Sequence, residues 1–135
     1  MNDTISLLVP ARSCYLRLIR GLIDNCLKNV ISDEKLKNRI VLAVNEAYAN
    51  VIEHAYSGEE GRPFELKVII EDKKITIILK DEGKKVPLKE IKPRDLDDIK
   101  PGGLGTHFIK EIMDEVIYDI SPPVGTFLRM VKNLP

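Results

Sequence analysis

Three polar side chains that could form a metal and base site stand at helical spacing in the stretch NEAYANVIEHAY: Glu46, Asn50 and Glu53. Positions i, i+4 and i+7 of an α-helix fall within about 60° of one another around its axis. The amide oxygen of Asn50 suits Mg²⁺, and the carboxylate of Glu46, one turn earlier, could accept a proton from a hydroxyl or a water. Any amphipathic helix also needs a polar face turned to water. On this stretch alone, both interpretations stay open.

A second candidate is Asp81, in the stretch KDEGKK, where a predicted strand runs into a loop. A carboxylate fixed there could accept a hydrogen bond from an exocyclic amine such as that of adenine. Gly83, two residues later, removes a side chain that would block a flat ligand. The alternative interpretation is an ordinary turn of the Asp-x-Gly type.

A third candidate is the glycine cluster in PGGLGTHFIKEIMD, where Gly102, Gly103 and Gly105 come directly before a predicted helix. Their backbone N–H groups, with those of the first helical turn, could surround phosphate oxygens, and the helix dipole favours an anion there. The stretch does not match the G-x-x-x-x-G-K-[ST] pattern of a Walker A loop. The alternative is a flexible loop end followed by a helix start.

The elements that must position these residues follow from the hydrophobic pattern. Residues 4–11 alternate like a strand, a helix runs from a cap at Ser13 to Val30, and a second runs from a cap at Ser32 to Tyr56. A hairpin of two alternating strands, PFELKVIIED and KKITIILKDEG, comes next. A polar stretch, a short helix after PGGLG, and the strand pair DEVIYDIS and GTFLRMVKNL close the chain.

This order, β-α-α-β-β-loop-α-β-β, lacks the strict alternation of a doubly wound parallel sheet. It predicts an α+β fold: a two-layer α/β sandwich in which three helices cover one face of a mixed, mostly antiparallel sheet. We expect residues 1–135 to form a single domain.

Composition excludes several functional classes. Lys plus Arg equals Asp plus Glu at 21 each, so no basic excess predicts direct binding of nucleic acid. The apolar runs are too short to span a membrane, and the first residues lack the pattern of a secretion signal. Cys14 and Cys26, about 18 Å apart on one predicted helix, are too distant for a disulfide. We therefore expect a cytoplasmic protein with no membrane association.

Taken together, in this order and with these gaps, the three clusters resemble the N, G1 and G2 boxes of the GHKL ATPase superfamily. The matching stretches are EAYANVIEHAY, DEG, and GGLG followed by MDEV. Within that superfamily the chain is similar to the small bacterial anti-sigma-factor serine/threonine kinases, whose first box reads N-E-A-x-x-N-x-x-x-H-A-Y and whose C-terminal part carries a G-T. The resemblance extends from about residue 8 to about residue 131, and the first box is its most specific part.

The resemblance implies the Bergerat fold and an ATP·Mg²⁺ site. By this resemblance Asn50 would coordinate Mg²⁺, and Glu46 would be the general base for a substrate serine or threonine. Asp81 would bind the adenine amine, Gly83 would make room for the ring, and Thr126 would support that contact. Main-chain contacts to phosphate would come from Gly103, Leu104, Gly105 and Thr106, and the segment Lys84 to Gly102 would be the lid.

Some residues depart from the family pattern. After DEG the family often has an aromatic residue and an Asp, where this chain has Val86 and Pro87, so we expect the lid to be anchored differently. After GGLG two apolar residues are usual, and here Thr106 and His107 stand instead. We interpret His54 as a structural or capping residue rather than a ligand, and Glu53 as a solvated carboxylate.

The resemblance therefore implies a serine/threonine protein kinase that acts as an anti-sigma factor. It would phosphorylate a small anti-sigma-factor antagonist, bind a sigma factor and form a homodimer. One alternative is a non-catalytic ATP-binding regulatory module, which the substituted lid residues motivate. Another is a detached histidine-kinase-type catalytic domain, which ranks low because only 12 residues precede the first predicted helix.

Overall fold

A computed structural model describes residues 2–84 and 103–135, and the side chains from residue 108 onward within the second range. The element order β-α-α-β-β-α-β-β confirms the predicted one. The elements are β1 (Asp3–Ala11), a 3₁₀ turn (Ser13–Tyr15), α1 (Leu16–Leu27), α2 (Glu34–Asn50), a π-helical turn (Val51–Ala55), β2 (Arg62–Ile70), β3 (Lys74–Asp81), α3 (Gly103–Ile112), β4 (Glu115–Asp119) and β5 (Phe127–Asn133).

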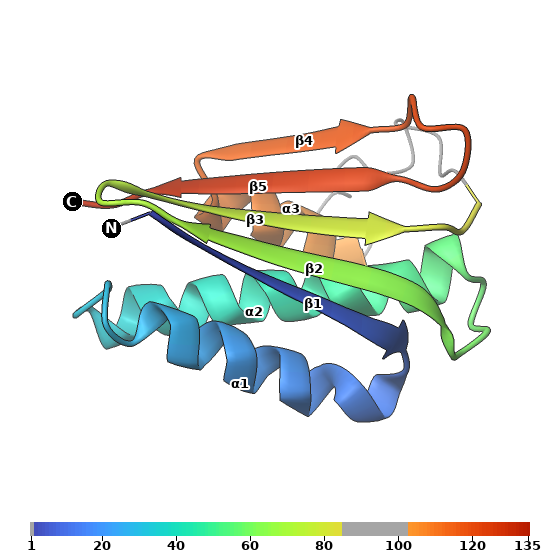
Figure 1. Cartoon of the computed structure of the whole chain (residues 1–135), viewed down its shortest axis with the longest axis horizontal. Coiled ribbons are helices and arrows are strands. Elements are labelled where there is room, and N and C mark those ends of the chain that lie inside the picture. The colour runs from blue at the N-terminus through green and yellow to red at the C-terminus, as the bar shows by residue number, and fades with distance from the viewer. Residues whose placement is uncertain (1, 85–102) are drawn as a thin grey trace.

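The five strands form one sheet in the order β1-β2-β3-β5-β4, and every neighbouring pair in it is antiparallel. The predicted two-layer sandwich is confirmed, with a sheet more regular than the mixed one expected. Alternation places Phe64, Leu66 and Val68 of β2 on the buried face, because successive side chains of a strand point to opposite sides. The helices lie against that face of the sheet (Figure 1).

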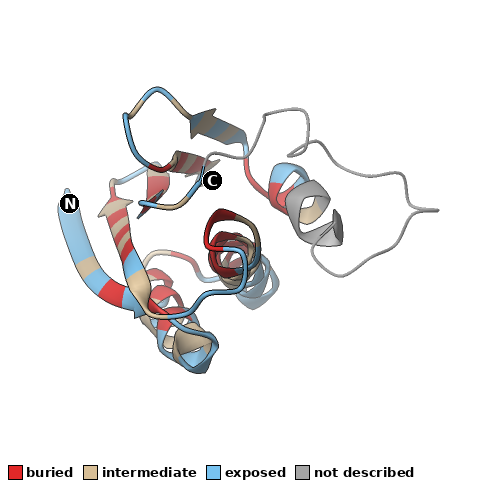
Figure 2. Cartoon of the chain, turned by 90° about the vertical axis from the view of Figure 1, so that its right-hand side faces the viewer, coloured by how far each residue is buried: buried red, intermediate tan, exposed pale blue. Residues whose placement is uncertain are grey.

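Helix α2 is the central helix of the second layer, since it packs against both α1 and α3. Its apolar residues Ile40, Ala43, Val44 and Ala47 are buried in the core shared with the sheet. Figure 2, seen from one end of the molecule, shows α2 lying between the other two helices with buried residues on its sides. Among the described residues, no helix is long and apolar enough to cross a membrane.

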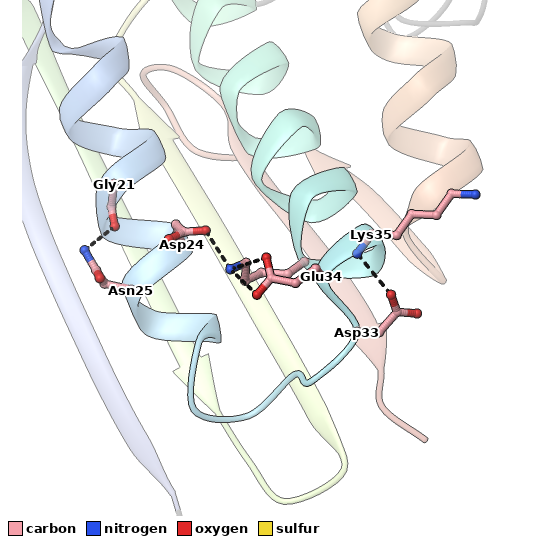
Figure 3. A network of polar contacts seen from close by, with 7 residues as sticks. Gly21, Asp24, Asn25, Asp33, Glu34 and Lys35 are labelled. Atoms are coloured by element: carbon pink, nitrogen blue, oxygen red, sulfur yellow. Dashed lines mark hydrogen bonds and ion pairs between the residues drawn. The ribbon is translucent and has the colours of Figure 1, made fainter.

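A polar link joins α1 to the start of α2 (Figure 3). The buried ammonium of Lys37 lies 3.1 Å from Asp24 Oδ1 of α1 and 2.9 Å from Glu34 Oε2 of its own helix. Hydrogen bonds to Glu34 and Asp24 raise the pKa of Lys37, so the side chain stays charged despite its burial. This pair of contacts fixes the helix that carries Glu46 and Asn50 against its neighbour.

Both predicted helix caps were wrong. Asp33, not Ser32, caps α2: its carboxylate accepts the backbone N–H groups of Lys35 and Leu36, and the first of these bonds is drawn in Figure 3. Ser13 begins a 3₁₀ turn instead of capping α1, and its own N–H donates to the Glu60 carboxylate. Both errors are displacements near helix ends, where several Ser and Asp residues compete for the cap.

Candidate functional site

The first candidate cluster lies where α2 changes its winding. Helix α2 ends at Asn50 and continues as a π-helical turn, in which the Tyr56 N–H donates to the Val51 carbonyl 3.0 Å away, five residues back. Such turns are rare and occur frequently at functional sites. Glu46 and Asn50 remain one α-helical turn apart, and both are half-buried.

The π-helical turn breaks the predicted ladder at its third member. Because the turn is wider than an α-helical one, Glu53 leaves the regular spacing from Asn50. Its exposed carboxylate lines a separate cavity of about 460 Å³ beside Ser13 and Glu60. His54 Nε2 lies 4.0 Å from Glu53 Oε2, and no further described contact makes it a ligand. Glu46 and Asn50 therefore remain the two residues of the predicted metal and base site.

The side-chain oxygen of Asn50 is buried and has no hydrogen-bond partner among the described residues. A buried amide oxygen without a donor is unfavourable by about 1–3 kcal/mol, so such atoms are rare unless a ligand or ion completes them. A hard, neutral oxygen suits Mg²⁺. The described side chains include no cluster of three His, Cys, Asp or Glu that could hold a metal. An ion bound by Asn50 would therefore need oxygen ligands from phosphate or water.

Asp81 is the last residue of β3 and only 6% of it is exposed. Its carboxylate accepts the Gly83 N–H at 2.9 Å, and its own N–H donates to the Thr126 carbonyl at 3.1 Å. Burial raises the pKa of Asp81, and the backbone N–H groups of Gly83 and Thr126 partly oppose that rise. Thr126 thus supports Asp81 through the backbone. A carboxylate buried to this degree and fixed by N–H groups is suited to accept one directed hydrogen bond from a ligand.

Gly83 lies against the end of the π-helical turn. A Cβ built on Gly83 would come within 2.3 Å of the Ala55 carbonyl oxygen, which also accepts the Lys84 N–H at 2.9 Å. The close approach of this helix end is therefore one reason for glycine at this position. Room for a flat ring remains a prediction.

Gly125 lies at the candidate site, although the sequence predicted no role for it. Its φ is +77°, and a Cβ there would lie 1.8 Å from the Asp81 carbonyl oxygen. The turn before β5 therefore passes directly over the end of β3. The Gly-Thr pair of residues 125–126 was the available signal, but only the threonine was given a role.

The glycine cluster lies partly inside a helix instead of before it. Gly103 and Gly105 belong to the first turn of α3, whose N–H groups lack partners within the helix. Leu104 and Thr106 share this turn. The predicted lid, including Val86, Pro87 and Gly102, lies outside the described residues apart from Lys84.

The three clusters come to the same end of the molecule. In Figure 1 the end of α2, the end of β3, the start of β5 and the start of α3 all lie on the right-hand side. The bond from Lys84 to Ala55 joins the loop after β3 to the helix end, and α3 packs against α2. The ends of α2 and β3, at Asn50 and Asp81, thus lie at one end of the molecule, and Thr126 is hydrogen-bonded to Asp81 there.

Known proteins resemble this chain in sequence and in fold. A family model described as the histidine kinase-like ATPase domain matches residues 9–132. A Bacillus pumilus protein named Serine-protein kinase RsbW is 28% identical over 148 aligned residues, covering 99% of this chain and 90% of that protein. A Bacillus licheniformis protein named Anti-sigma F factor is 30% identical over 99 residues, covering 70% of this chain and 68% of that one. A chain in the crystal structure of the SiaB-SiaC complex from Pseudomonas aeruginosa has the same fold, with a TM-score of 0.73 at 13% identity, covering 94% of this chain and 88% of that one.

Proposed function

The chain belongs to the histidine kinase-like ATPase domain family, and from that premise we propose that it is an ATP-dependent serine/threonine protein kinase acting as an anti-sigma factor. The resemblance drawn from the three boxes is thereby confirmed at the level of the family. The activity is supported by relatives named serine-protein kinase and anti-sigma F factor.

The observation that carries the proposal is the buried amide oxygen of Asn50, one helical turn after Glu46, which has no hydrogen-bond partner among residues 2–84 and 108–135. Asn50 would hold Mg²⁺, which neutralises phosphate charge when it is bound. The carboxylate of Glu46, one turn earlier and half-buried, is of a type that can accept a proton from a substrate hydroxyl.

Glu46 would act as the general base. The Oγ of a substrate serine or threonine attacks the γ-phosphorus of ATP, the bond to the β-phosphate oxygen breaks, and ADP leaves. Glu46 takes the proton that Oγ loses. Asp81 would accept the adenine amine, Thr126 would hold Asp81, and the backbone N–H groups at Gly103 to Thr106 would contact phosphate.

The partners follow from the same resemblance. The substrate would be a small anti-sigma-factor antagonist protein with a phosphorylatable serine or threonine, and the second partner would be a sigma factor. We also expect a homodimer. Sigma-factor binding and dimerisation can be measured directly by mixing the purified proteins and determining the molar mass of each complex.

The test of the kinase proposal compares Glu46→Gln with Glu53→Gln. Both replacements remove one carboxylate from the same helical segment, but only Glu46 is proposed as the base. Transfer of labelled phosphate from ATP to a candidate antagonist protein from the same organism is expected to fall by about 10²–10⁴ in Glu46→Gln. In Glu53→Gln it is expected to stay near the wild-type rate. Equal transfer by both variants would remove Glu46 from the role of base.

The second candidate is a non-catalytic ATP-binding module, favoured by Val86, Pro87, Thr106 and His107 at positions where the kinases usually have other residues. It predicts tight binding of ATP·Mg²⁺ and no phosphate transfer to any antagonist from the same organism. The same labelled-ATP experiment separates the two functions, because both require nucleotide binding and only one transfers phosphate.

A further inference from the structure

The ladder between β2 and β3 has an unusual end, and it lies directly beside Asp81. The regular register closes with Phe64 opposite Asp81. One step further stand Pro63 and Glu82. Proline has no N–H to donate, so the ordinary pair of backbone hydrogen bonds cannot form there. On its other side Pro63 faces Pro10 of β1, which has no N–H either.

The hydroxyl of Tyr56 occupies this gap. It donates to the Pro63 carbonyl and accepts the Glu82 N–H at 2.8 Å, so a side chain takes the place of one rung between the strands. Tyr56 is only 3% exposed, and burial raises the pKa of its phenol, which therefore stays protonated and able to donate. Pro63 and Glu82 are themselves exposed, so the buried group that these two bonds satisfy is the Tyr56 hydroxyl.

Arg62 reinforces the same junction. Its guanidinium carbon lies 4.9 Å from the centre of the Tyr56 ring, and its Nη2 donates to the Glu82 carbonyl at 3.4 Å. Both backbone groups of Glu82 are thus held by side chains, one from Tyr56 and one from Arg62. The neighbouring Ala55 carbonyl holds Lys84. The loop after Asp81 is therefore held at two points by the segment that follows α2: Glu82 is bonded to Tyr56, and Lys84 is bonded to Ala55.

We propose that Tyr56 is a positioning residue for base recognition: its hydroxyl closes the β2–β3 ladder and so holds the Asp81–Gly83 loop at a fixed position relative to the helix that carries Glu46 and Asn50. The inference rests on the proposed function, in which Asp81 accepts the adenine amine. Tyr56 itself does not contact the nucleotide in this scheme. Its loss should therefore weaken discrimination between bases more than binding of the triphosphate.

The experiment measures the dissociation constants of ATP and of purine riboside triphosphate, which lacks the 6-amino group, in the presence of Mg²⁺. Their ratio reports the contribution of the amine alone. In Tyr56→Phe we expect the preference for ATP to fall about three- to tenfold, as expected for loss of one hydrogen bond that orders the acceptor. The affinity for purine riboside triphosphate should change much less.

Tyr48→Phe is the matched control. Tyr48 is equally buried, comes from the same helix two turns earlier, and its hydroxyl also contacts a proline carbonyl, that of Pro10 at 3.1 Å. Its other bonds join Arg12 and not the Asp81 loop. It should lower stability to a similar extent and leave the ratio unchanged. Amide exchange at Glu82 in the nucleotide-free protein should accelerate in Tyr56→Phe only.

Asp81→Asn separates failure of this inference from failure of the proposed function. The amide would keep its oxygen on the Gly83 N–H and turn a donor toward the base, so the preference for ATP should be lost. A wild-type ratio in Asp81→Asn would overturn the base-reading role and the inference with it. If Asp81→Asn loses the preference for ATP while Tyr56→Phe keeps the wild-type preference, the inference about Tyr56 is wrong and the role of Asp81 stands. If Tyr56→Phe fails to fold, Arg62→Leu serves in its place, because this variant keeps the Tyr56 hydroxyl. We expect it to lower the preference for ATP by a smaller factor. An unchanged preference in Arg62→Leu would count against the proposal.

Discussion

At the scale of single residues, two buried polar groups that differ in their hydrogen bonding define the candidate site. The carboxylate of Asp81 is buried and held by backbone N–H groups, whereas the amide oxygen of Asn50 is buried and has no partner in the described part of the chain. The first is a fixed acceptor already partly satisfied by the protein. The second is an acceptor left for a ligand. Asn50 differs from Asn45, whose oxygen is also buried without a partner in the described residues, because it ends α2 just before the turn that binds the loop after Asp81.

Replacing Asn50 by Ala should therefore weaken Mg²⁺-dependent nucleotide binding without lowering the stability of the free protein. We expect the affinity for ATP in Mg²⁺ to fall at least about tenfold, since the variant loses one metal ligand. The melting temperature should stay unchanged or rise, because a buried oxygen without a donor is removed. Titration calorimetry with and without Mg²⁺ measures the first effect, and a thermal melt measures the second.

Asn45→Ala provides the control for that prediction. Asn45 also has a buried, unpartnered side-chain oxygen within the described residues, but it lies five positions earlier, about 140° around the helix axis. Nucleotide binding by this variant should match the wild type. Equal Mg²⁺ dependence in Asn50→Ala and Asn45→Ala would count against the metal site.

At the scale of elements, the site depends on how closely three chain segments approach one another. The π-helical turn lies directly against Gly83, and the turn before β5 lies directly against the end of β3 at Gly125. Neither approach leaves space for a Cβ. These contacts are made by backbone atoms, which cannot move aside as the end of a flexible side chain can.

We expect Gly125→Ala to destabilise the protein clearly more than Gly58→Ala. Both glycines have a positive φ, +77° and +83°, so alanine suffers similar backbone strain of about 1–2 kcal/mol at each. Only at Gly125 would the new Cβ collide with a neighbour, the Asp81 carbonyl oxygen. That collision should add about 1–3 kcal/mol. Urea unfolding of the two variants measures the difference, and equal free energies of unfolding would show that the turn can move away from β3.

At the scale of the whole molecule, the sequence predicted what repeats along the chain and missed what depends on distant contacts. Alternation in residues 64–70 and 75–79 identified β2 and β3, and the element order predicted the sandwich. The boxes identified the family. The π-helical turn left no local pattern, because NVIEHAY reads equally well as α-helix. The contact of Tyr56 with Pro63 and Glu82 could be recognised only once the strand register was known.

The last prediction concerns the cooperativity of the chain. The sheet and the helices share one buried core, and the candidate site lies at one end of it, with Asn50 on a helix and Asp81 on a strand. A ligand that binds both elements should therefore stabilise the chain as one unit. We expect one thermal transition that rises by about 10 °C at ATP·Mg²⁺ concentrations near 100 times the dissociation constant. A calorimetric scan measures it, with Asn50→Ala as the control that should shift less under the same conditions. Two transitions, only one of which moves with nucleotide, would show that residues 1–135 do not unfold as a single domain.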